Sequence, residues 1–82
     1  MNDFIQSLKT LAVDKLNFHS PVKIQREWLL RENKAYLAIM QNGRFVFQIP
    51  CEANEVSLSE NEELAYETLS ELGFKVTRSF SH

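Results

Sequence analysis

Hydrophobic and polar positions alternate most clearly on the two sides of Asn42-Gly43, in residues 34–41 and 44–49. Alternation with period two predicts β-strands. Asn-Gly between two apolar runs predicts a two-residue type I′ turn, because both central residues of that turn need a positive φ. We therefore expect a β-hairpin. A regular two-residue turn places Ile39 opposite Val46 and Leu37 opposite Gln48.

This regular register divides the hairpin into two faces. One face is apolar, and we expect it to be the core face, with Tyr36, Ala38, Met40, Phe45, Phe47 and Ile49. The other face is half polar, and its apolar residues are Leu37, Ile39 and Val46. Either the first helix or residues 51–58 cover this second face, or it is partly exposed, or it is a partner surface.

Upstream of the hairpin, apolar residues at three- and four-residue spacing predict an amphipathic helix over residues 3–16. Apolar residues at alternate positions predict a strand over residues 22–31, although Arg26 occupies one of these positions. A polar turn over residues 31–34 leads into the hairpin.

The length of this turn decides the register of the first strand. A two-residue loop at Glu32-Asn33 places Trp28 opposite Leu37, and a three-residue loop places Trp28 opposite Tyr36 on the other face. Both registers remain open.

Downstream of Pro50, residues 51–58 predict a connector. Ser59-x-x-Glu62 predicts a capping box that begins a second helix. Gly73 predicts a left-handed helix end, with Phe74 closing back on Leu69, and residues 74–80 alternate as a last strand. The order α-β-β-β-α-β predicts a single α+β domain over residues 1–82, an antiparallel meander with helices packed on the sheet.

Charge is distributed unevenly along this pattern. Residues 1–44 carry seven Lys and Arg against four Asp and Glu, whereas residues 45–74 carry seven Glu and no Lys or Arg. Four of these glutamates fall within roughly 80° on the second helix: Glu60, Glu63, Glu67 and Glu71. We interpret this acidic stripe either as a solvated helix face or as a docking surface for a partner with a basic surface.

Candidate chemistry is sparse. Cys51 is the only cysteine, so no internal disulfide forms, and no catalytic, metal or nucleotide motif is present. His19 precedes Ser20-Pro21 and is typical of a turn, and His82 is terminal. We therefore expect no enzyme activity, no metal and no cofactor. Without a signal peptide or an apolar stretch of about 20 residues, we expect a cytoplasmic protein with no membrane contact.

Basic residues around the first three strands offer an alternative function. They are Lys23, Arg26, Arg31, Lys34 and Arg44, with Tyr36, Phe45 and Phe47 among them. Aromatic side chains on a sheet with flanking cations are typical of modules that stack nucleic-acid bases. The regular hairpin register places these aromatic residues on the predicted core face, and this placement favours a protein partner over nucleic acid.

Two family resemblances accompany this pattern. The α-β-β-β-α order of residues 3–72 is similar to the double-stranded-RNA-binding domain, which implies RNA binding. Where that family has a basic start of the last helix, this chain has Ser59-Glu60-Asn61-Glu62-Glu63. Residues 42–50 followed by an acidic helix also resemble HicB-type antitoxins, which implies an inhibitory role.

The residues favour a small protein-binding module, in the class of inhibitors, immunity or antitoxin factors, chaperones or adaptors. In this interpretation Glu60, Glu63, Glu67 and Glu71 steer the partner, and Leu37, Ile39 and Val46 supply apolar contacts. A homodimer through the second sheet face is a further expectation.

Overall fold

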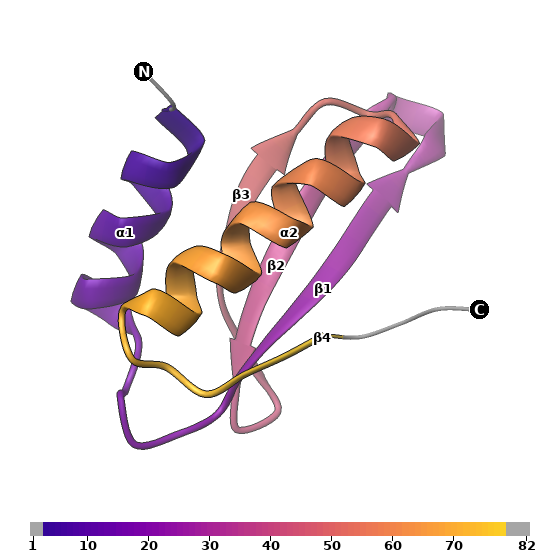
Figure 1. Cartoon of the computed structure of the whole chain (residues 1–82). Coiled ribbons are helices and arrows are strands. Elements are labelled where there is room, and N and C mark those ends of the chain that lie inside the picture. Colours follow the sequence, from indigo (N-terminus) through magenta and orange to yellow (C-terminus); the bar gives the residue numbers. More distant parts are fainter. Residues whose placement is uncertain (1–2, 79–82) are drawn as a thin grey trace.

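A computed structural model describes residues 3–78 as two helices and a four-stranded sheet (Figure 1). The elements are α1 (Asp3–Lys15), β1 (Val22–Leu29), a 3₁₀ turn (Leu30–Glu32), β2 (Lys34–Gln41), β3 (Arg44–Cys51), α2 (Glu55–Glu71) and β4 (Val76–Arg78). The predicted α+β class and the order α-β-β-β-α-β are confirmed. The predicted strand over residues 74–80 is shorter in the structure, and its last two residues lie outside the described range.

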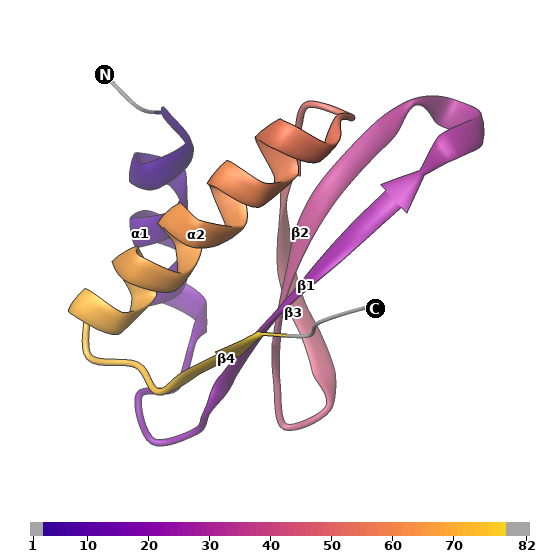
Figure 2. The ribbon, with the colours of Figure 1, turned by 45° about the vertical axis from the view of Figure 1, so that its right-hand side comes forward.

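The strands lie in the order β3-β2-β1-β4, with antiparallel pairing from β3 to β1 and parallel pairing between β1 and β4. Parallel pairing arises because α2 carries the chain back along the sheet from the end of β3 to the level at which β1 begins, so that β4 then runs in the same direction as β1 (Figure 1). Both helices pack on the same face of this mixed sheet (Figure 2). In the described chain, neither helix packs against the opposite face.

The core lies between the two helices and the sheet. Its fully buried large side chains come from α1, the first two strands and α2: Leu8, Val22, Ile24, Leu37, Ile39, Leu58 and Leu69. Phe47 and Ile49 of β3 complete it. Burying these apolar surfaces supplies the main driving force for folding such a small chain.

A β-bulge changes the register of the β2–β3 hairpin. Asn42 and Gly43 have φ values of 54° and 73°, which confirms the predicted tight turn. Met40 pairs with Phe45 beside the turn, but Ile39 pairs with Phe47, so Val46 is the extra residue of the bulge. The prediction of a regular register, with Ile39 opposite Val46, is therefore wrong.

This shift by one residue exchanges the faces of the hairpin. Phe47 and Ile49 join Leu37 and Ile39 on the face that the helices cover. Tyr36, Ala38, Met40 and Phe45 remain on the opposite face. The prediction of one core face is therefore correct for Phe47 and Ile49 and wrong for Tyr36, Met40 and Phe45, whereas Ala38 is buried although it lies on the face opposite the helices.

The β1–β2 connection also differs from both sequence-based registers. Trp28 pairs with Ala35 and Leu29 with Lys34, so four residues form the connection. The 3₁₀ turn Leu30–Glu32 fills it, and Asn33 closes it in the left-handed region at φ 52°. Trp28 thus lies on the same face as Leu37, as the two-residue loop predicts, but two positions away along β2.

Helix α2 begins four residues before the predicted capping box. Asn54 is the N-cap, and its side-chain oxygen accepts a hydrogen bond of 2.8 Å from the Ser57 amide. At the other end, the Phe74 amide donates to the Leu69 carbonyl and the Gly73 amide to the Ser70 carbonyl. These two bonds, with Gly73 at φ 103°, confirm the predicted Schellman ending.

Candidate functional site

Within residues 3–78, no helix covers the sheet face opposite α1 and α2 (Figure 2). We call it the uncovered face. Side chains alternate across a sheet, so the strand registers define its members. They are Lys23, Gln25, Glu27 and Leu29 of β1, Lys34, Tyr36, Ala38 and Met40 of β2, Phe45, Gln48 and Pro50 of β3, and Thr77 of β4.

Ala38 forms the floor at the centre of this face. It lies on β2 between Gln25 of β1 and Gln48 of β3, and only 2% of it is exposed. Because its neighbours are larger, a shallow cavity of about 300 Å³ forms around it. The cavity is lined by Glu27, Leu29, Tyr36, Ala38, Phe45 and Gln48.

Apolar groups surround this cavity without being buried. Phe45 is 56% exposed and Leu29 is 43% exposed, while Tyr36 and Met40 are half-buried. Exposed aromatic and aliphatic side chains that gather around a hollow are typical of interaction surfaces, because water contact with such a patch is unfavourable. The uncovered face therefore combines a shallow hollow with exposed apolar side chains at its rim.

The uncovered face also carries charges of both signs. Glu27 accepts a hydrogen bond of 3.0 Å from the Gln25 amide group. Within residues 3–78, neither Glu27 nor Lys23 nor Lys34 forms an ion pair. Lys23 and Glu27 lie two positions to either side of Gln25 on the same strand. Their charges are thus available to a partner.

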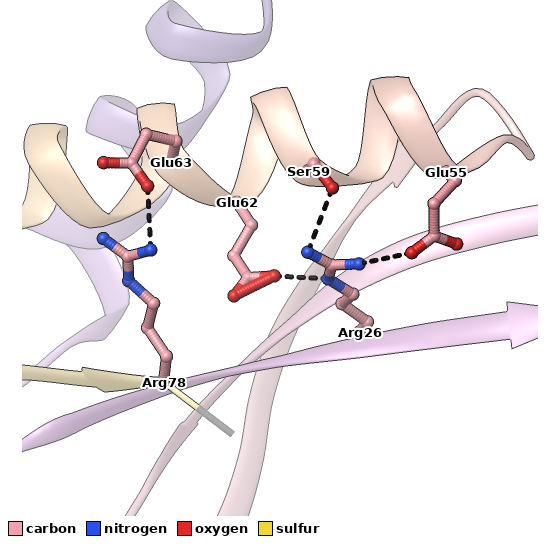
Figure 3. Close-up of polar contacts among 6 residues, drawn as sticks. All are labelled: Arg26, Glu55, Ser59, Glu62, Glu63 and Arg78. Atoms are coloured by element: carbon pink, nitrogen blue, oxygen red, sulfur yellow. Dashed lines mark hydrogen bonds and ion pairs between the residues drawn. The ribbon is translucent and has the colours of Figure 1, made fainter. Parts of the chain in front are cut away.

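Arg26 lies on the other face, beneath α2, and is held by an ionic cluster (Figure 3). Its guanidinium donates to Glu62, to Glu55 at 3.1 Å and to the Ser59 hydroxyl at 3.2 Å. The hydrogen bond to Glu62 raises the pKa of Arg26 above its ordinary value. Only 4% of Glu62 is exposed. Ser59 and Glu62, predicted as a capping box, therefore anchor α2 to β1.

This arrangement removes Arg26 from the predicted nucleic-acid surface. The sequence indicates this position of Arg26, since Arg26 stands where the alternation of β1 calls for an apolar, core-facing residue. Glu62 likewise falls at helical spacing among Leu58, Ala65 and Leu69, which all become buried. A cation and an anion at two core-facing positions predict a mutual ion pair.

The other four cations of that predicted surface are exposed but dispersed. Lys23 and Lys34 lie on the uncovered face, Arg31 in the 3₁₀ turn and Arg44 beside the hairpin turn. Arg44 and Lys15 line a wide, open depression of about 690 Å³. The structure does not bring these cations together into one cluster.

The acidic stripe of α2 is exposed, as its spacing predicts, on the helix layer of the molecule. Glu63 is engaged, because Arg78 of β4 donates to it at 2.8 Å (Figure 3). The Arg78 guanidinium also lies 4.0 Å above the Tyr66 ring. In the described part of the chain, Glu60, Glu67 and Glu71 form no ion pair.

Two of the three apolar residues proposed from the sequence as partner contacts are inaccessible. Leu37 and Ile39 are fully buried under the helices, and Val46 is half-buried in the bulge. The helices cover the face of Leu37 and Ile39, which agrees with the first of the alternatives left open by the sequence, and the bulge adds Phe47 and Ile49 to the same face.

Cys51 and His19 are the described residues that the sequence offers for catalytic or metal-binding chemistry. Burial raises the pKa of the Cys51 thiol, so the thiol stays protonated at neutral pH. His19 is exposed in the turn after α1, where its amide donates to Asn17. Residues 3–78 contain no group of three His, Cys, Asp or Glu side chains able to hold a metal ion. His82 lies outside the described residues.

No helix between residues 3 and 78 is long and apolar enough to cross a membrane. No family model, no curated protein and no solved structure matches this chain.

Proposed function

We propose that the protein is a binding module that docks a protein partner on the uncovered face. The observation that carries this proposal is Phe45, an aromatic side chain more than half exposed beside the cavity around Ala38. Aromatic anchors next to small hollows dominate the binding energy of protein interfaces. The face has the apolar centre and the polar surroundings that such interfaces share.

The acidic stripe is assigned no contact in this proposal. Glu60, Glu67 and Glu71 belong to the helix layer, on the other side of the sheet from Phe45. A flat partner docked on the uncovered face does not reach them. Their charge attracts a partner with a basic surface over a distance of about 8–10 Å at physiological salt.

Affinity capture with matched variants tests the proposal. Phe45→Ser removes the exposed aromatic ring, and Val13→Ser removes an apolar side chain that is 61% exposed on α1. We expect the wild type and Val13→Ser to retain the same proteins, and Phe45→Ser to lose them. Equal retention by Phe45→Ser and the wild type would overturn the proposal.

A second candidate is single-stranded nucleic acid on the same face. It is favoured by Tyr36 and Phe45, which the bulge leaves on the uncovered face together with Lys23 and Lys34. Glu27 within this face opposes it, because a carboxylate repels phosphate. Titration with single- and double-stranded oligonucleotides over a series of salt concentrations tests it. Absence of binding at low salt would exclude it.

A further inference from the structure

We propose that the partner of the uncovered face is a second copy of this chain. The two copies form a two-fold symmetric pair, in which Lys23 of each copy meets Glu27 of the other. This inference rests on the proposed function, since it names the partner of the same surface.

The charge pattern of β1 favours a second copy as the partner. In the pair, the uncovered faces of the two copies lie against each other. The two-fold axis lies between them, perpendicular to the strands and level with Gln25. This axis reverses the direction of β1 in the second copy. Positions equally far from Gln25 on its two sides then face each other, so Lys23 meets Glu27 twice. Both side chains lack an ion pair within the described chain. A surface that complements itself in this way is what a two-fold interface requires.

The neighbouring strands match under the same axis. Gln25, Ala38 and Gln48 form one row across the sheet, so Ala38 meets Ala38, and these small side chains let the sheets approach. On β2, Met40 lies level with Lys23 and Tyr36 level with Glu27. Met40 therefore meets Tyr36 of the other copy, a favourable contact between sulfur and an aromatic ring.

The exposed Phe45 also finds an apolar neighbour. Phe45 pairs with Met40 and Pro50 pairs with Tyr36, so the axis sets Phe45 against Pro50 of the other copy. An axis along the strands gives a poorer match, since it sets Lys23 against Phe45. That arrangement buries a charge against an aromatic ring without a counter-ion, which is unfavourable.

The size of the uncovered face determines how tightly the two copies are expected to bind each other. Three strands about 4.8 Å apart and eight residues of about 3.3 Å give a face of about 14 by 26 Å. Two such faces bury less than about 1,200 Å² in total, the range of weak and transient interfaces. We therefore expect a dimer that forms with rising concentration and dissociates on dilution.

Reciprocal charge reversal tests this pairing. Lys23→Glu sets Glu against Glu, and Glu27→Lys sets Lys against Lys, so each variant alone should dimerise at least about tenfold more weakly. Mixed together, the two variants should form a heterodimer, because both contacts then join opposite charges. The double variant Lys23→Glu/Glu27→Lys should dimerise like the wild type. Glu67→Lys, which makes the same charge change as Glu27→Lys but on the helix layer, is the matched control for that variant and should leave dimerisation unchanged.

Sedimentation equilibrium from about 10 μM to about 1 mM measures these states, with circular dichroism as the check on folding. A wild type that stays monomeric throughout, or single variants that dimerise like the wild type, would overturn the inference. In that case, capture of another protein that still depends on Phe45 leaves the proposed function intact. Capture that does not depend on Phe45 overturns the proposed function itself.

Discussion

Ile39 pairs with Phe47 across the β2–β3 hairpin, and Val46 forms the bulge beside this pair. The pairing puts Phe47 and Ile49 under the helices together with Leu37 and Ile39. It also leaves Phe45 and Tyr36 on the face that no helix covers. One extra residue in β3 therefore decides which side of the sheet is core and which side is available to a partner.

The first prediction follows from this exchange of faces. Ile39→Ala should lower the free energy of unfolding by about 2–5 kcal/mol, because it leaves a cavity in the core beneath the helices. Phe45→Ala should change it by only about 0.5 kcal/mol, because the ring is largely in water. Urea unfolding of the two variants at a concentration where the chain is monomeric measures the difference.

The regular hairpin register predicts the opposite order of the two stability losses. A larger loss of stability in Phe45→Ala than in Ile39→Ala would show that the aromatic side of the hairpin is the core side.

The second prediction concerns the anchor between β1 and α2. Glu62→Ala removes the buried acceptor of Arg26, while Glu55 and Ser59 keep their contacts with the partly exposed guanidinium. We expect a loss of about 1–3 kcal/mol in the free energy of unfolding. Glu67→Ala, on the exposed side of the same helix, should cost about 0.5 kcal/mol or less.

A double-mutant cycle with Arg26→Ala isolates the pair. The double variant should lose less stability than the sum of the single losses, since each single change already breaks the same contact. Additive losses would mean that Arg26 and Glu62 stabilise the fold independently of each other.

The third prediction concerns Cys51 and pH. Burial raises the pKa of its thiol in the folded state, so the unfolded chain loses this proton first as the pH rises. The contribution of the neutral thiol to the free energy of unfolding is therefore intact below about pH 8.5 and decreases above that pH. Chemical denaturation from pH 7 to 10 should show a steeper fall for the wild type than for Cys51→Ala. Parallel curves would exclude this contribution.

Local signals account for the parts of the fold that the sequence predicts correctly. Asn42-Gly43 specifies its turn because both residues tolerate positive φ, and Gly73 specifies the end of α2 for the same reason. The helical spacing of residues 3–16 and the alternation of the strands depend only on neighbouring residues. The element order follows from these signals.

The bulge and the start of α2 depend on tertiary packing. Alternation continues through Val46, so only the helices on the other side show that β3 must shift its register there. Ser59 and Glu62 fit a capping box by spacing, yet Asn54 caps the helix, which begins four residues earlier at Glu55, and Glu62 pairs with Arg26. The candidate site inherits the first of these errors, since its apolar contacts were assigned to the wrong side of the hairpin.

Residue-resolved NMR over a dilution series shows whether the uncovered face binds a second copy. With rising concentration, we expect the amide signals of residues 23–27, 36–40 and 45–48 to shift. The signals of α2 from Glu60 to Glu71 should stay in place, because the helix layer takes no part in the contact. No shift at any concentration, or shifts confined to α1 and α2, would contradict the account.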